Sequence, residues 1–513
     1  MRPSVRGIPA RLGDLVAILT GAVLLRLISG VGFANYDTLY ALAWGGQLAR
    51  GVTPAYGVPI APTPHPLVEL LGVLLYPLGP RAVENVTVAL GFLALSACGW
   101  VVYRLGSHWF GRAAGALAAL LLLTRVPILS YGVRAYVDVP YLLLVLGALL
   151  VETRRPRAGA PVLALLALAG LLRPEAWVFS GLYWLYMMDW IPLPARLRDR
   201  QRTYAQAQGD RPRDDRSRNG RDTGAGPRQD GRQFLVLTLL TLSAPLIWIL
   251  SDLLITGDPL WSLTNTRHTA EALGRTTGIA NVPEYIPRRI GEILGPPVLA
   301  GAALGGVLSL LWLRRRALVG AAAGVLAVAV FAVFATAGLP INTRYAFLAS
   351  AILCIFCGAG AFGWTRLDKD DRRRHWWMAG GALVLVALAV FAPSQYRSVH
   401  SQLDKLARQQ SIEGDLLALV DDGAISLRCG VIGVPNHAPI PLLALYLKTS
   451  PRNIVSAQVK PISSGQYIDP ASSEVEQDYI LDPHDPHLSV SVPPGFTEVQ
   501  ANRSWLIFQH CPS

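Results

Sequence analysis

The chain has 513 residues, of which 52% are hydrophobic and only 16% are charged, well below the roughly 25% of charged residues in soluble globular proteins. This composition excludes an ordinary soluble enzyme, and long blocks of Leu, Ala, Val and Gly predict a mainly α, polytopic membrane bundle. The net charge of +12 does not indicate nucleic-acid binding, because most Lys and Arg residues fall in short connectors between apolar blocks.

The apolar blocks predict about eleven membrane spans, each judged against the length needed to cross the hydrocarbon core. Taken in chain order, they are 12–32, 82–103, 113–131, 139–152, 159–172, 176–190, 233–256, 295–313, 317–338, 345–364 and 376–392. Arg-rich connectors at alternate ends place the N-terminus in the cytoplasm and the loops 33–81 and 257–294 outside.

Three other segments are predicted not to span the membrane. Residues 191–232 are rich in Arg and Gly with almost no apolar content, which predicts a disordered cytoplasmic loop. Residues 38–50 and 66–79 are too short to span and predict helices at the outer interface. Tyr40 and Trp44 are expected at the level of the lipid headgroups.

The tail, 393–513, changes character and predicts a small extracytoplasmic α/β domain, separate from the membrane domain 1–392. Helical patterning at 400–420 precedes alternating, strand-like runs. Cys429 and Cys511 stand at the ends of two such runs. If the tail lies outside, in an oxidising compartment, they are expected to form a disulfide. The tail is also expected to pack over the outer loops and shape an acceptor site.

Ionisable residues at membrane depth are costly, so those that persist are candidates for function. Here they gather at the outer ends of the predicted spans: Asp37, His65, Arg134, Asp138, Arg173, Glu175, Asp252, Asp258, Arg267, His268 and Arg344. Carboxylates can act as general bases or hold a divalent metal, and arginines can clamp a phosphate. The residue types therefore favour an anionic phospholipid-type substrate attacked by a neutral nucleophile.

Each candidate also has a structural alternative. Asp37 would serve as a helix cap, and Asp138 as a cap for the span that follows it. Arg173 and Glu175 would pair with each other. If Asp37 is instead the general base, partial burial beneath the helix at 38–50 is expected to raise its pKa.

Several short segments together resemble a known family. Residues 36–40 (YDTLY), 51–56 (GVTPAY) and 65–67 (HPL) resemble the first outside loop of the GT-C glycosyltransferases, more closely the protein-mannosyltransferase and aminoarabinose-transferase branch. The resemblance continues through 136–140 (YVDVP) and Arg344-Tyr345. It departs at Thr38, where the family often has a second acid, and at Pro66, which is a double proline in the family.

The resemblance implies a multi-pass glycosyltransferase of the cell membrane. Such an enzyme moves a hexosyl or pentosyl group from a polyprenyl-phosphate donor to an acceptor hydroxyl on the outer face, with inversion. Asp37 would be the catalytic base and Asp138 a second catalytic carboxylate. The residues expected to bind the donor phosphate or substrate are His65, Arg344, Arg173, Glu175, Arg267 and His268.

The partners implied are membrane lipid, the lipid-linked donor, and a glycan, lipid or protein acceptor in the cell envelope. A divalent metal, if one is used, would be held by Asp37 and Asp138. A lipid-linked sugar transporter and a non-catalytic membrane subunit remain as alternatives. Inverted repeats, which are typical of many transporters, are not evident in the sequence.

Overall fold

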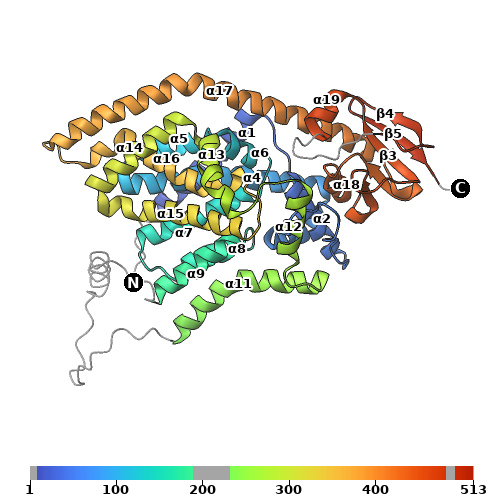
Figure 1. The fold of residues 1–513 in the computed structure, drawn as a ribbon, viewed down its shortest axis with the longest axis horizontal. Helices are drawn as coiled ribbons and strands as arrows, with labels where there is room; N and C mark the ends of the chain where they lie inside the picture. The colour runs from blue at the N-terminus through green and yellow to red at the C-terminus, as the bar shows by residue number, and fades with distance from the viewer. Residues whose placement is uncertain (1–7, 189–230, 481–490, 512–513) are drawn as a thin grey trace.

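The computed structural model describes residues 8–188, 231–480 and 491–511. A long helical bundle occupies one side of the molecule, and a small sheet lies at the end near the C-terminus (Figure 1). The mainly α class with a small C-terminal α/β part, predicted from the sequence, is confirmed. Most of the predicted cytoplasmic loop 191–232 lies outside the described residues.

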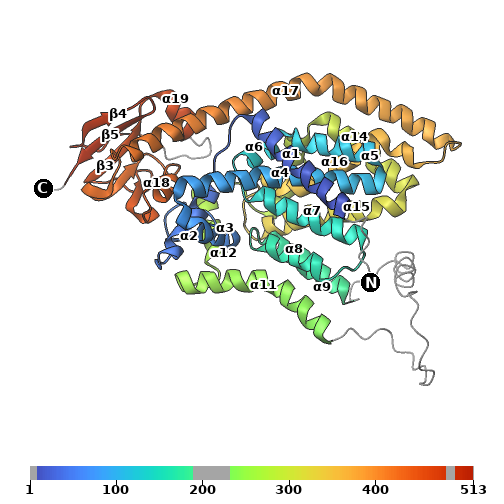
Figure 2. The ribbon, with the colours of Figure 1, turned by 180° about the vertical axis from the view of Figure 1, so that it is seen from behind.

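The bundle contains helices of very different lengths (Figures 1 and 2). They are α1 (Ile8–Ser29), α4 (Pro80–Phe110), α5 (Arg112–Leu123), α6 (Val126–Val133), α7 (Asp138–Arg154), α8 (Ala160–Gly170), α9 (Glu175–Met187), α11 (Gly231–Thr256), α14 (Pro296–Trp312), α15 (Arg314–Thr336), α16 (Phe347–Phe362) and α17 (Arg372–Asp421). Two loops between them fold into shorter helices: α2 (Tyr36–Ala49) and α3 (Pro66–Leu75) in the first, α12 (Trp261–Ala272) and α13 (Val282–Leu294) in the second.

The structure does not confirm the number of spans that the sequence predicts. By length and composition, 6 helices of the described residues could each cross a membrane, or up to 8 if each of two bent helix pairs counts as one span. The first bent pair is α5 with α6, at 66°, and the second is the segment Ile279–Leu294 with α14, at 107°. The predicted count of about eleven is therefore not confirmed, because α7, α8 and α9 have only 17, 11 and 13 residues and do not reach the length required of a candidate span.

Small residues allow the central helices to approach closely. A Cβ atom added at Gly305 of α14 would lie 1.9 Å from the Phe356 carbonyl oxygen, and one added at Gly360 would lie 2.3 Å from the Gly301 carbonyl oxygen. α14 and α16 therefore pack backbone against backbone, as small residues permit in membrane helices. This contact fixes α16, and with it the short 3₁₀ helix η4 (Thr343–Ala346) that carries Arg344.

α17 joins the bundle to the sheet. It has 50 residues, which corresponds to about 75 Å of helix. In Figure 1 it runs along one edge of the bundle and reaches the sheet. The predicted span 376–392 and the predicted tail helix 400–420 are thus parts of one helix, although Pro393 lies between them.

The C-terminal sheet has the strand order β2-β1-β3-β5-β4. Its strands are β1 (Ile432–Val434), β2 (Ile454–Ser456), β3 (Gly465–Pro470), β4 (Thr497–Ala501) and β5 (Trp505–His510). β1 pairs in parallel with β2 and β3, whereas β5 is antiparallel to both β3 and β4. Helices α18 (Ile440–Tyr446) and α19 (Ser473–Val475) lie in the connections.

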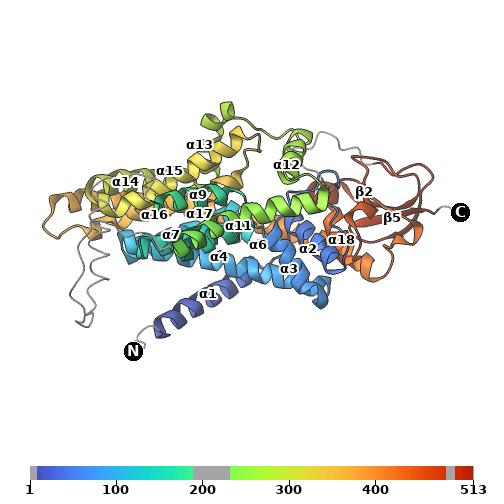
Figure 3. The same cartoon turned by 90° about the horizontal axis from the view of Figure 1, so that it is seen from below.

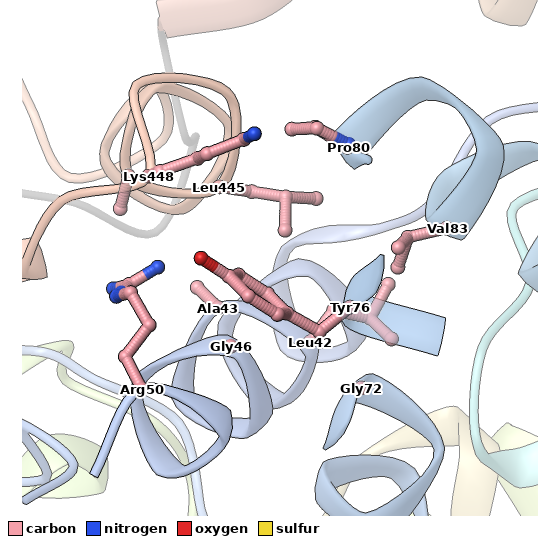
Figure 4. Close-up of a pocket in the computed structure, with 11 residues that line it drawn as sticks. Leu42, Ala43, Gly46, Arg50, Gly72, Tyr76, Pro80, Val83, Leu445 and Lys448 are labelled. Carbon is pink, nitrogen blue, oxygen red and sulfur yellow. The ribbon is translucent and has the colours of Figure 1, made fainter. Parts of the chain in front are cut away.

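The first loop and the tail share one hydrophobic core. Leu39, Leu42 and Trp44 of α2 belong to the same buried cluster as Leu416 of α17 and Leu443 of α18. Figure 4 shows a small pocket at this junction, with Arg50 and Lys448 on either side of Tyr76. The tail therefore packs directly on the first loop (Figure 3).

This shared core corrects the expectation for Tyr40 and Trp44. Both side chains are fully buried, with an exposed fraction of 0%, and their ring centroids are 5.0 Å apart. They do not lie at a headgroup interface. The protein covers them because the helix that carries them lies between α3 and α18, a long-range contact that the local pattern does not reveal.

A disulfide joins Cys429 to Cys511. The two residues are 82 positions apart, so the bridge closes a loop that contains all five strands of the sheet. We expect the Cys429→Ser, Cys511→Ser double variant to lose about 2–4 kcal/mol from the free energy of unfolding of the tail. Thermal unfolding with and without a thiol reductant checks this: the reductant should lower the wild-type midpoint and leave that of the variant unchanged. If the midpoint of the wild type stays unchanged after its disulfide has been completely reduced, the prediction is contradicted.

Candidate active site

Five of the predicted site residues form one continuous cluster of charges. Arg344 Nη1 is 2.7 Å from Asp37 Oδ2 and 3.9 Å from Asp138 Oδ2. Arg173 pairs with Asp138 and, at 2.5 Å, with Glu175. These side chains come from α2, α7, the start of α9 and η4, which are far apart in the sequence.

Capping bonds position Asp37. Asn35 is the N-cap of α2, and its side-chain oxygen accepts from the Thr38 backbone N–H. The Asn35 backbone N–H donates to the Arg134 carbonyl, and the Thr38 hydroxyl donates to the Ala135 carbonyl at 2.9 Å. The start of α2 is thereby fixed to the segment that leads into α7 and Asp138. Asp37 lies in the first turn and is not the cap, so the capping alternative for this residue is wrong.

Arg173 holds the buried part of the cluster together. The side chains of Asp138 and Glu175 are only 2% and 7% exposed. The Arg173 guanidinium also lies 4.4 Å from the ring centroid of Tyr345 and 5.6 Å from that of Tyr141. Both buried carboxylates thus contact one guanidinium, which the rings hold in place, and Asp138 has a second, longer contact with Arg344.

This arrangement predicts a large loss of stability in Arg173→Met. We expect about 3–5 kcal/mol, because two buried carboxylates lose their partner. Thermal unfolding in detergent checks this beside Arg81→Met, which breaks an exposed pair with Asp421 and should cost about 1 kcal/mol or less. Adding Asp138→Asn and Glu175→Gln to Arg173→Met should restore part of the loss. Equal losses in the Arg173 and Arg81 variants would refute the prediction.

His65 is buried and uncharged. Its Nδ1–H donates to the Leu172 carbonyl at 2.8 Å, since a carbonyl oxygen can only accept. Burial lowers the pKa of His65 to about 4. At neutral pH its Nε2 therefore carries a lone pair and is suited to accept from a hydroxyl, whereas it is poorly suited to bind a phosphate.

The charge state of Asp37 differs from the expectation. Burial raises its pKa, but the Arg344 guanidinium beside it, followed by smaller effects of the His65 ring and of Arg275, outweighs burial and leaves the pKa below its ordinary value. The expected rise is therefore wrong for the protein without substrate, because the sequence did not reveal that Arg344 would contact Asp37 directly.

Two predicted residues lie outside the cluster. Arg267 and His268 are on the exposed face of α12, and the Arg267 Nε–H donates to the Ala337 carbonyl at 2.6 Å. Arg275, which follows α12, is the basic residue of this loop that influences Asp37. Sequence reasoning missed it because nothing in the spacing of the loop distinguishes it from Arg267.

The residues do not fit a divalent metal. Among the described residues, no group of three or more His, Cys, Asp and Glu side chains is arranged to hold one. Asp37 and Asp138 are each paired with an arginine, and Arg344 reaches both carboxylates. A metal bound by the two carboxylates would have to displace these guanidinium groups.

Three buried polar atoms in the cluster make no hydrogen bond within the described part of the chain: Arg344 Nε, Asp138 Oδ2 and Glu175 Oε2. A buried donor without an acceptor is costly, and at a candidate site it marks a position for a ligand. Arg344 contacts Asp37 through Nη1, so its unused Nε–H is left to donate to a bound anion.

The fold and the charge cluster define a polytopic membrane protein with an acid–arginine centre beneath its first loop. The aminoarabinose transferase ArnT from Cupriavidus metallidurans, solved in the apo state, has a similar structure, with a TM-score of 0.55 and 14% identity over 97% of this chain and 98% of that one. The archaeal oligosaccharyltransferase AglB from Archaeoglobus fulgidus, solved with an inhibitory peptide and a dolichol-phosphate, gives a TM-score of 0.42 and 12% identity over 86% and 64%.

No protein-family model matches the chain, and no curated protein matches its sequence significantly. The likeness to ArnT confirms the GT-C fold that the sequence resemblance predicts. At 14% identity it shows the fold and assigns no residue a role.

Proposed function

We propose that the protein is a membrane glycosyltransferase that moves a sugar from a polyprenyl-phosphate donor to an acceptor hydroxyl on the outer face of the membrane. The observation that carries the proposal is the Asp37–Arg344 pair, a base and a phosphate-binding group 2.7 Å apart in one partly buried site. The GT-C fold and the sequence resemblance support the same class of reaction.

The two residues have complementary tasks. Arg344 binds the donor phosphate through its free Nε–H and stabilises the charge that develops there as the sugar departs. When Arg344 binds the phosphate, its electrostatic interaction with Asp37 becomes weaker. The pKa of that buried carboxylate then rises, and the carboxylate becomes a better base. Donor binding thus prepares the base.

The reaction is a single displacement. Asp37 takes the proton from the acceptor hydroxyl while the hydroxyl oxygen forms a bond to the anomeric carbon. The bond between that carbon and the phosphate oxygen breaks, and polyprenyl phosphate leaves with the electron pair. Because there is one attack and no covalent intermediate on the protein, the anomeric configuration is inverted.

The surrounding residues position these groups. Arg173, Asp138 and Glu175 support the site from below through their ion pairs. His65 Nε2 accepts a hydrogen bond from a sugar hydroxyl. The tail contributes to the acceptor side, since the ring of His437 lies 5.2 Å from that of Tyr36, the neighbour of Asp37. No role is proposed for Arg267 or His268.

The test uses the purified protein in detergent with synthetic polyprenyl-phospho-hexoses and -pentoses, and with nucleotide sugars as controls. We expect release of free polyprenyl phosphate from one lipid-linked donor and none of the nucleotide sugars to be consumed. If the protein moves intact donor across the membrane of a liposome without cleaving it, the transporter alternative is supported and the proposal is contradicted.

A further inference from the structure

An apolar cavity of about 850 Å³ lies between α7, α8, α9 and α15. These helices lie near one another in Figures 1 and 2. Asp138 of the candidate active site is the first residue of α7, and Arg154, which lines the cavity, is the last residue of the same helix. Because α7 has 17 residues, the two are about 25 Å apart. The cavity is therefore distinct from the candidate active site and lies toward the opposite end of the bundle.

The cavity has largely apolar walls, and the charged residues of its lining are Glu152, Arg154, Arg315 and Arg316. Leu149, Leu166 and Phe179 are among the apolar side chains that line it. Arg315 and Arg316 lie at the start of α15, are exposed, and form no ion pair with any residue that the structure describes. The like charge of Arg366 lies close to Arg316. An apolar cavity with two guanidinium groups at its edge is complementary to an amphiphile with an anionic head.

We propose that this cavity binds an anionic phospholipid of the bilayer, with an acyl chain between the helices and the phosphate on Arg315 and Arg316. The size falls within the range of well-formed ligand pockets, and the apolar walls can accommodate an acyl chain that is already in the bilayer. Basic pockets between membrane helices commonly select anionic headgroups. The lipid-linked donor is a poorer occupant, because its phosphate would lie at the wrong end of the bundle, far from Arg344.

The test compares lipid binding to the purified full-length protein by native mass spectrometry, with phosphatidylglycerol and phosphatidylcholine of matched chains as probes. The wild type should retain phosphatidylglycerol preferentially. Arg315→Gln, Arg316→Gln should lower its affinity about tenfold or more, because two charge-assisted contacts are lost. The matched control is Arg372→Gln, Arg373→Gln, an exposed basic pair on α17 outside the cavity, which should bind like the wild type.

A second variant tests the apolar part. Ala322→Trp, at an exposed position in the cavity lining, should reduce lipid retention while thermal unfolding without added lipid stays near the wild type. Equal binding of the two phospholipids, or equal losses in the α15 and α17 double variants, would overturn the proposal. Preferential retention of polyprenyl phosphate would overturn it as well and assign the cavity to the donor lipid.

Discussion

Asp37→Asn is expected to lower the rate of sugar transfer by about 10²-fold or more while the protein stays folded and still binds its donor. Asparagine keeps the size of the side chain and can still accept a hydrogen bond from Arg344, but it cannot take the acceptor proton. Stability should change little, because Asn35 and not Asp37 caps α2. The readouts are transfer from a synthetic donor, donor affinity and the thermal midpoint.

Asp14→Asn is a matched control. Asp14 pairs with Arg104 at 2.6 Å, so this variant also removes one charge from an acid–arginine pair, but away from the cluster. Its transfer rate should equal that of the wild type. If both variants lose activity to a similar extent, the loss reflects general damage and not the removal of a base.

Arg344→Gln is expected to lower transfer by a similar factor and also to change its pH dependence. In the wild type, Arg344 lowers the pKa of Asp37 against the opposing effect of burial, so the carboxylate stays ionised to low pH in the free enzyme. Without Arg344, burial dominates and the pKa rises. Because the ionised form is the active base, the acid limb of kcat/KM should move to higher pH in the variant.

The measurement is the pH profile of kcat/KM for both proteins between pH 4 and pH 8. Arg275→Gln provides a graded comparison, since Arg275 also lowers the pKa of Asp37 but follows Arg344 in the size of its effect. Its acid limb should shift less. If the acid limb of Arg344→Gln does not shift, the acid limb of the profile does not report the ionisation of Asp37, and the prediction is wrong.

The candidate site could be predicted in part because charges at membrane depth are conspicuous. Asp37, Asp138, Arg173, Glu175 and Arg344 all stood out at the ends of apolar blocks, and the structure brings them together. Their pairing could not be predicted, since α2 and η4 meet only through the tertiary fold. The direction of the Asp37 pKa shift depended on that pairing, so burial alone gave the wrong sign.

The errors elsewhere have a common cause. Arg267 and Arg275 lie on one loop, and no periodic pattern shows which of them turns toward Asp37. Tyr40 and Trp44 have the composition of an interfacial helix, yet the tail covers them. Hydropathy located the apolar segments well, but its count of about eleven spans is not confirmed, since α8 and α9 have only 11 and 13 residues.

The most direct test of the proposed reaction is the anomeric configuration of the product. A synthetic polyprenyl-phospho-sugar of known configuration is incubated with the wild-type protein and an acceptor alcohol, and the new glycosidic bond is assigned by NMR, with Asp37→Asn as the blank. We predict inversion at the anomeric carbon, with one polyprenyl phosphate released for each bond formed and almost no product from the variant. Retention of configuration, or intact donor after prolonged incubation with every acceptor and sugar tried, would contradict a single displacement with Asp37 as the base.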